Sequence, residues 1–172
     1  MPAQTPNVFT FPRQEPGTQG HAHLIEPLRT LPRVLADLLK GVSDAHASRR
    51  PTADAWCIKE LAGHLLDAVT INHKRLYMMS TQTDPLLDGW DADETVRERG
   101  YAARELGGIV QEIKAVREDT TQLLTTLVNW NWARTGQHPV LGRESIRQRV
   151  EDMQAHEGEH IDELRLMVAA GR

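Results

Sequence analysis

Two histidines placed four residues apart near the end of the chain, His156 and His160, constrain this sequence more than any other feature. In an α-helix, residues at this spacing lie one above the other on the same face, with Cβ atoms about 5–6 Å apart. Met153 precedes the pair by one turn and Leu164 follows it by one turn, so we expect this face to point toward the core. A buried imidazole needs partners for its ring nitrogens, and one shared metal ion would satisfy both rings.

The letters from His156 to His160 also match two zinc-peptidase patterns, H-E-x-x-H and H-x-x-E-H. Such peptidases usually take a third ligand from downstream, and the only downstream carboxylates here, Asp162 and Glu163, lie on the same helix within one turn. They cannot close a tripod, so a third ligand must come from upstream, which does not fit the common peptidase layouts. The alternative without a metal is that each histidine is a core residue bonded to an ordinary neighbour.

The bulk composition places the chain among ordinary soluble domains. Its 172 residues, 40% of them hydrophobic and 26% charged, are enough for one domain with a real core. The formal net charge is −4, so we expect no nucleic-acid partner. Apolar runs are short and the N-terminus has neither a basic start nor an apolar block, so we expect no membrane span and no signal peptide. The single cysteine, Cys57, excludes an internal disulfide and a multi-cysteine zinc site, and a cytoplasmic location is expected.

Prolines shape the first part of the chain. Four prolines within residues 1–20 predict an extended N-terminal arm. Pro27 and Pro32 then predict a short turn over residues 22–29, followed by a first helix from about Leu31 to Lys40.

A second helix is expected from about Ile58 to Met79. His64 lies on its inward stripe among apolar positions, and Asp67 follows one turn later, close to the same face. Cys57 and Glu60 occupy the positions where a capping box would place Ser or Thr and Glu. Cysteine is a poor cap, so the start of this helix departs from the usual chemistry.

The second half of the chain predicts two more helices. Residues 80–100 form a long connection, in which Trp90 is a candidate lid residue, and a third helix is expected over about 101–128. Residues 129–143 are expected to form a tight loop rich in aromatic residues, Gly and Pro. The last helix should start near Ser145, where Ser145 and Gln148 fit a capping box.

Four helical runs without strand-like alternation predict an all-α four-helix bundle, a single domain over residues 21–172. The connection over 80–100 is long enough to travel the length of the bundle, which allows helices two and three to run parallel. Facing helices have axes about 8–10 Å apart, so His64 from one helix and His156 and His160 from another can meet on one ion. Three protein ligands leave a coordination position open, which suggests catalysis or substrate binding.

The order of certain residues resembles a known family, and the resemblance runs from about Leu24 to the C-terminus. The segments that carry it are Trp56-x-x-x-Glu60-x-x-x-His64-Leu65-x-Asp67, Gly136-x-His138-Pro139-x-x-Gly142, and Ser145 followed by His156-x-x-x-His160. This pattern resembles the DinB-like (YfiT-like) metalloenzymes. The resemblance implies an up-down-down-up bundle, a homodimer, and one divalent metal, commonly nickel or zinc, held by His64, His156 and His160. Cys57, where Ser or Thr is common, departs from the pattern but leaves the metal site untouched.

The resemblance also implies a function. Characterised relatives include S-transferases and isomerases that use bacillithiol, mycothiol or glutathione, so the leading hypothesis is a metal-dependent thiol transferase acting on a small-molecule substrate. Arg75 and Arg134 are the candidates for meeting the carboxylates of such a thiol cofactor. The alternative is a hydrolase that activates a metal-bound water, with Asp67 or Glu157 taking a proton.

Two further readings stay open from the residues alone. Bound neutral histidines commonly donate their second N–H to a carboxylate, for which Asp67, Glu157 and Glu159 are candidates. The alternative for each is an ordinary solvated helix charge, which is the preferred interpretation for Glu159. A hypothesis from another class is a non-catalytic bundle that binds a small ligand or uses the metal only for stability.

Overall fold

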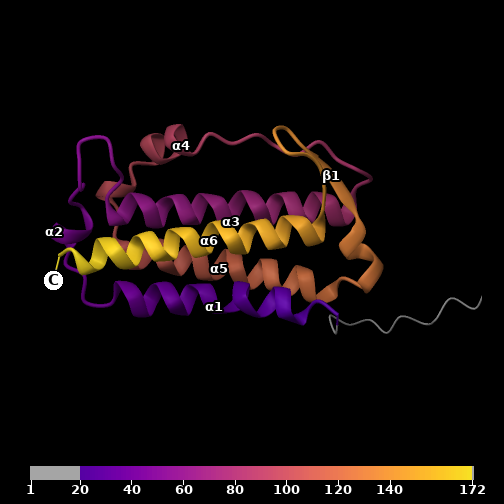
Figure 1. Ribbon diagram of the computed structural model, residues 1–172, viewed down its shortest axis with the longest axis horizontal. Coiled ribbons are helices and arrows are strands. Elements are labelled where there is room, and N and C mark those ends of the chain that lie inside the picture. The colour runs from indigo at the N-terminus through magenta and orange to yellow at the C-terminus, as the bar shows by residue number, and fades with distance from the viewer. Residues whose placement is uncertain (1–19, 172) are drawn as a thin grey trace, which may run out of the picture.

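The computed structural model describes residues 20–171, so the arm expected over residues 1–20 lies, apart from Gly20, outside the described residues. Four long helices lie side by side (Figure 1): α1 (Ala22–Leu39), α3 (Ile58–Thr81), α5 (Leu106–Thr126) and α6 (Ile146–Ala169). Helices α1 and α6 run in one direction and α3 and α5 in the other (Figure 1). This is the expected up-down-down-up four-helix bundle.

Each long helix packs against two others. Both α3 and α1 lie against α5 and α6, so α5 and α6 face each other across a diagonal of the bundle. The core falls into two apolar clusters along the bundle, of which the first includes Leu35, Leu61, Leu65, Ile113 and Leu164, and the second includes Leu28, Leu76, Leu124, Trp132 and Val150. Among residues 20–171 no helix combines the length and the apolar composition that crossing a membrane would require.

The first helix corrects an expectation, because α1 runs without a break through Pro27 and Pro32. A proline inside a helix removes one hydrogen bond and costs about 3 kcal/mol. Here six apolar side chains on one face of α1 are buried, and such packing supplies most of the stability of a helix in a protein. Pro27 has no N–H to donate to the backbone carbonyl of His23, four residues earlier. Both residues are exposed, so water can hydrogen-bond to that carbonyl instead.

The long connection between α3 and α5 is partly helical. It contains α4 (Ala92–Arg99), and Asp91 caps this helix by accepting from the backbone N–H of Glu94. Gly100, in the left-handed region at φ 60°, ends α4, and the 3₁₀ turn η1 (Tyr101–Ala103) follows. A further short helix, α2 (Asp44–Ala47), lies in the connection between α1 and α3. Because Tyr101 is buried in this turn, α5 begins five residues later than the start expected at position 101.

A β-hairpin joins α5 to α6, where a loop was expected. After the 3₁₀ turn η2 (Asn129–Ala133), β1 (Thr135–His138) pairs antiparallel with β2 (Gly142–Ser145). Nδ1 of His138 accepts the backbone N–H groups of Val140 and Leu141 at 3.2 and 3.1 Å and so closes the turn. The capping box expected at Ser145 is present, because its hydroxyl and the Gln148 side chain accept from each other's backbone N–H groups.

Candidate metal centre

Three imidazole rings from two helices meet at one point. His64 comes from α3, and His156 and His160 come from the neighbouring, antiparallel α6. The Nε2 atom of His64 lies 3.1 Å from that of His156 and 3.0 Å from that of His160, and the last two are 3.1 Å apart. Among residues 20–171, this is the group of three histidine, cysteine or acidic side chains whose ligand atoms all lie within 4.8 Å of one another. The convergence expected from the sequence is therefore observed.

Ordinary hydrogen bonds cannot explain this triangle. Each ring nitrogen of a neutral imidazole is either a donor or an acceptor. Among three nitrogens in mutual contact, at least two must have the same role, so at least one of the three close pairs in this cluster is not a hydrogen bond. Three lone pairs directed at one shared cation account for all three short distances together.

The spacing of the three nitrogens fits a first-row divalent ion. With metal–nitrogen bonds of about 2.0–2.1 Å, ligand nitrogens lie about 3.3 Å apart at tetrahedral angles and about 2.9 Å apart at right angles. The separations of 3.0–3.1 Å fall between these values. The three-histidine site therefore supports a divalent metal, and three protein ligands leave room for a further ligand.

The electrostatics of the cluster favour the neutral imidazoles that bind metals. Burial, followed by the neighbouring rings of His160 and His156, lowers the pKa of His64 to about 3. Burial and the ring of His160 also lower the pKa of His156. At neutral pH both groups are thus deprotonated, so a metal ion does not have to compete with protons for them.

A carboxylate orients one of the rings. Oε2 of Glu163 lies 3.1 Å from Nδ1 of His160, the nitrogen on the far side of the ring from the cluster. This arrangement fixes which ring nitrogen is free to bind a metal and raises its basicity. The candidates taken from the sequence for this role did not include Glu163. Glu163 lies seven residues after His156 and therefore on the same helix face, so this spacing could have identified it as a partner of the histidines.

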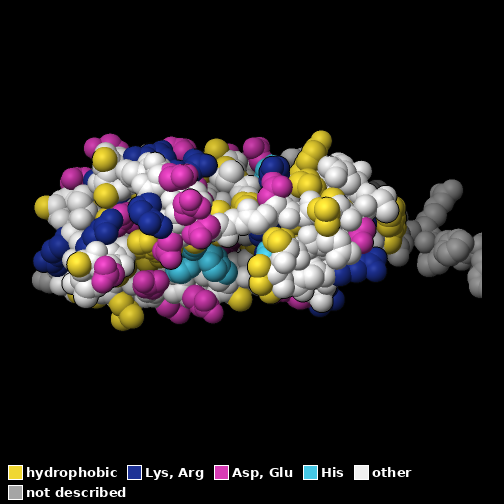
Figure 2. Space-filling view, turned by 90° about the horizontal axis from the view of Figure 1, so that it is seen from above, with side chains coloured by type: hydrophobic (Ala, Val, Ile, Leu, Met, Phe, Trp, Pro, Cys, Tyr) yellow, Lys and Arg dark blue, Asp and Glu magenta, His cyan; other side chains and the backbone are white. Residues whose placement is uncertain are grey.

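Two tryptophans enclose His64. The ring of Trp90 stacks on the imidazole at a centroid distance of 5.1 Å and an angle of 11°, and Trp56 lies at 4.9 Å with a tilt of 37°. Trp90 is held in place by a 3.0 Å hydrogen bond from its Nε1 to the hydroxyl of Thr95 in α4. His64 is 4% exposed, whereas the side chain of His160 is 19% exposed. Figure 2 shows histidine side chains at the surface near the middle of the molecule, with acidic side chains on both sides.

The structure does not bring Asp67 into the cluster. Its Oδ1 accepts a 2.7 Å hydrogen bond from the hydroxyl of Tyr101 and lies 3.1 Å from Nε of Arg99. Burial raises the pKa of the Asp67 carboxyl, while these two partners act in the opposite direction. The carboxylate therefore ties α3 to the last residue of α4 and to the turn that follows it.

Glu157 also lies away from the cluster, which corrects the expectation that it acts as a base there. Although it follows His156 in the chain, it points about 100° further round the helix, toward the interior. Its Oε1 accepts a hydrogen bond from Nη2 of Arg117 on α5, and both side chains are buried.

The two arginines expected at the cofactor have different positions. Arg134 donates to the backbone carbonyls of Met79 and Gln82 and so caps the end of α3. It is not brought to the histidines. Arg75 lies on the same face of α3 as His64, three turns or about 16 Å further along. It is buried, donates to the carbonyl of Asp88, and its Nε has no partner among the described residues.

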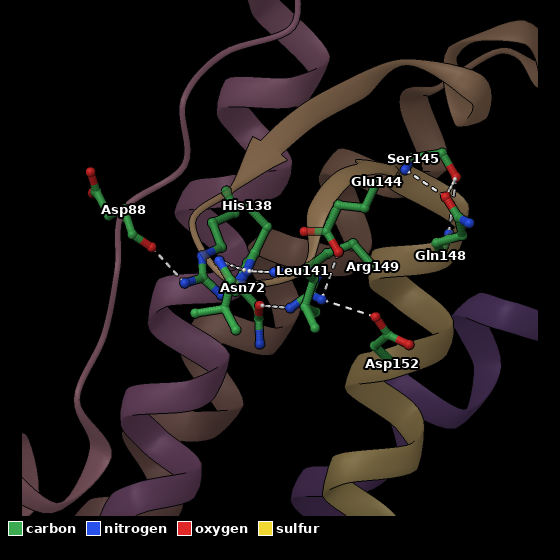
Figure 3. Close-up of polar contacts among 11 residues, drawn as sticks. Asn72, Asp88, His138, Leu141, Glu144, Ser145, Gln148, Arg149 and Asp152 are labelled. Carbon is green, nitrogen blue, oxygen red and sulfur yellow. Dashed lines mark hydrogen bonds and ion pairs between the residues drawn. The ribbon is translucent and has the colours of Figure 1, made fainter.

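A buried polar network lies under the hairpin, close enough to Arg75 for Arg149 and Glu144 to influence its pKa. Figure 3 shows its centre, Arg149 of α6, which donates to Glu144 at 2.7 Å, to Asp152 at 3.0 Å and to Asn72 of α3 at 3.4 Å. Arg149 precedes His156 by seven residues, so the network lies on the same α3–α6 seam as the metal centre. It anchors β2 to the two helices that supply the histidines.

Residues 28–164 match the model of the DinB superfamily, and this match spans most of the chain. The chain belongs to the DinB superfamily. The chain is also 24% identical over 139 residues to the uncharacterized protein YuaE of Bacillus subtilis (strain 168), a match that covers 74% of this chain and 86% of YuaE.

The fold is similar to that of a solved relative. The structure of YfiT from Bacillus subtilis, described as a probable metal-dependent hydrolase with an unusual four-helix bundle topology, superposes with a TM-score of 0.81. The match covers 99% of this chain and 92% of YfiT at 15% sequence identity. At that identity the likeness establishes the shared bundle, and the chemistry must be argued from the residues of this chain.

Proposed function

We propose that this DinB protein is a metal-dependent enzyme of the thiol S-transferase type. The observation that carries the proposal is the triangle of three Nε2 atoms, 3.0–3.1 Å apart, on one seam of the bundle. His64, His156 and His160 would hold one zinc or nickel ion. When bound, such an ion lowers the pKa of a coordinated thiol or water.

The surroundings of the triangle favour a thiol over a water as the nucleophile. The carboxylates expected to act as bases, Asp67 and Glu157, are both occupied by buried partners. A thiol coordinated to a divalent metal loses its proton without a protein base. The chemistry supplied would be a displacement: the sulfur would form a bond to an electrophilic carbon, the leaving group would depart with its bonding electrons, and the thiol proton would pass to solvent.

The residues of the chain would position the two reactants. Trp90 stacks on the His64 ring and Trp56 lies against it at a tilt, so these two tryptophans would form aromatic walls of the site. For the carboxylate of a low-molecular-weight thiol we propose Arg75, because its buried guanidinium has only a backbone carbonyl as a partner within the described residues. Arg134 is left out of this role because its guanidinium caps α3.

A hydrolase is the second candidate, favoured by the likeness to YfiT, which is described as a probable metal-dependent hydrolase. In this alternative the open position would hold water instead of a thiol. A proton acceptor would have to come from the rim of the site, where Glu163 already contacts His160.

The first experiment tests the metal centre. Protein stripped with a chelator should bind one zinc or nickel ion per chain, and His64→Ala should lose this binding. His73→Ala is the matched control, since His73 also lies on α3 but contacts Thr120 at 3.1 Å instead of the cluster. Equal metal binding by His64→Ala and the parent would refute the three-histidine centre.

The second experiment separates the two reactions. The metal-loaded protein is assayed with glutathione, bacillithiol and mycothiol against a fluorogenic electrophile such as monochlorobimane, and in parallel with an activated ester in the absence of thiol. Metal-dependent thiol conjugation supports the transferase. Metal-dependent ester cleavage without any thiol consumption would replace it with the hydrolase.

A further inference from the structure

A buried ion pair crosses the interior of the bundle directly behind the histidine cluster. Arg117 of α5 donates to Glu157 of α6, and the two side chains are only 1% and 8% exposed. These helices face each other across the diagonal, so the pair spans the centre of the bundle. Glu157 directly follows His156 in the H-E-x-x-H sequence. It is therefore adjacent in the chain to a ligand of the proposed metal centre.

Stability alone does not account for this pair. Taking two charges out of water costs several kcal/mol per ion, and replacing a buried ion pair with apolar residues of similar volume is often neutral or stabilising. The pair is also incompletely bonded, because Nε and Nη1 of Arg117 are buried and find no hydrogen-bond partner among the described residues. Burial accordingly lowers the pKa of Arg117.

Apart from Arg149, which donates to Asn72 and Glu144 near the start of α6, the rest of the buried face of α6 restrains its rotation only weakly. That face is formed mainly by apolar side chains, including Val150, Met153, Ile161 and Leu164, and apolar burial is non-directional. His156 and His160 lie at the margin of this face, half-buried. A rotation of α6 by about 20° would keep the apolar side chains covered, yet it would move atoms at the helix surface by about 2 Å.

Such a shift is far beyond what a metal site tolerates, since ligand distances must hold within about 0.2 Å. An ion pair does resist rotation, because its hydrogen bond requires a narrow range of distance and angle. Glu157 points to the bundle centre while His156, about 100° away on the same helix, points to α3. We propose that the Arg117–Glu157 pair fixes the rotation of α6 and thereby positions His156 and His160 against His64.

In this assignment, which rests on the metal centre proposed above, Glu157 is a positioning residue and takes no part in proton transfer. The glutamate of the H-E-x-x-H sequence anchors its own helix across the centre of the bundle to α5. Arg117 would support the same site through Glu157, although Arg117 itself contacts none of the three histidines.

The test replaces the pair by the apolar double variant R117M/E157M. We expect this variant to fold with an unfolding free energy equal to or above that of the parent, measured by urea titration of the metal-free protein. Its affinity for zinc, measured by competition with a chelating dye, should fall by about tenfold or more, the range found for residues that support metal ligands. Leu164→Met is the control, because it changes the packing of the same buried face without touching the ion pair.

Zinc affinity of R117M/E157M within about twofold of the parent would overturn the assignment, and so would an equal loss in Leu164→Met. If the double variant does not fold, Glu157→Gln takes its place, with the visible absorption spectrum of bound cobalt as the readout of ligand geometry. A changed spectrum supports the assignment, and an unchanged spectrum with unchanged affinity refutes it. Failure of the parent protein to bind zinc or cobalt would instead refute the metal centre itself.

Discussion

Replacing Gly63 with alanine would place one methyl group inside the ring of Tyr101. A Cβ atom at position 63 would lie 2.1, 2.2 and 2.6 Å from Cγ, Cδ2 and Cδ1 of that ring. Non-bonded carbon atoms are at their optimum about 3.5–4.0 Å apart, so the ring would have to retreat by about 1.5 Å. It has no free space for this, because Tyr101 is fully buried and its hydroxyl donates to Asp67.

The magnitude follows from two opposing effects. Expelling a buried aromatic ring removes about 3–5 kcal/mol, the cost of truncating such a side chain to alanine. Alanine in place of glycine inside a helix returns about 1 kcal/mol. We therefore expect Gly63→Ala to lower the free energy of unfolding by about 2–4 kcal/mol. The effect reaches the functional region, because Gly63 precedes His64 and Tyr101 holds the segment after α4 against α3.

Urea unfolding of two matched sets of variants checks this reasoning. Gly108→Ala in α5 meets no atom within 4 Å in the described part of the chain and should stabilise the protein by about 1 kcal/mol. In a Tyr101→Ala background the obstacle is gone, so adding Gly63→Ala should be neutral or stabilising. If Gly63→Ala stabilises the parent protein as Gly108→Ala does, the Tyr101 ring does not pack on this helix as described.

Three further substitutions test other parts of the structure. Burial, Arg75 and Arg149 lower the pKa of His138 below its unfolded value of about 6.5. Its neutral form therefore stabilises the hairpin at pH 7, and this contribution is lost as the pH falls below 6.5. His138→Asn should flatten the decrease in the urea-measured unfolding free energy between pH 7 and pH 5, and an unchanged pH profile would count against the described turn. Glu163→Gln should weaken zinc binding about tenfold in a dye competition, without changing the unfolding of the metal-free protein. Arg134→Met should release the last carbonyls of α3 and lower the unfolding free energy by about 1–3 kcal/mol, with faster amide exchange at that end of the helix.

The parts of the fold that the sequence predicted are those encoded by neighbouring residues. The start of α6 follows from the Ser145 and Gln148 side chains, which close a capping box within one turn. The meeting of His64 with His156 and His160 follows from helical periodicity and the short distance between helix axes. The expectations of a homodimer, a cytoplasmic location and a small-molecule substrate stay predictions.

The errors arose where tertiary packing overrides local preference. The prolines of α1 predicted a break, but the buried face of that helix outweighs their local cost. The hairpin escaped detection because its strands, TGQH and GRES, are four residues long and carry no apolar alternation. The sequence does not reveal the buried position of Arg117, because charged side chains usually face water and its partner Glu157 lies 40 residues away in the sequence.

The placement of the histidines at the margin of the core, which the sequence did not predict, fits a reactive centre better than full burial does. A cluster inside the core would exclude any substrate, and a cluster on the open surface would place the metal in bulk water, where charge interactions are weakest. His64, 4% exposed and enclosed by Trp56 and Trp90, supplies the low-polarity side of the centre. His160, with its side chain 19% exposed, supplies the side open to solvent. In the proposed enzyme, a small molecule would approach the ion from the more exposed His160 side, while the enclosed His64 side would keep water away, the condition under which a bound metal most strongly lowers the pKa of its ligand.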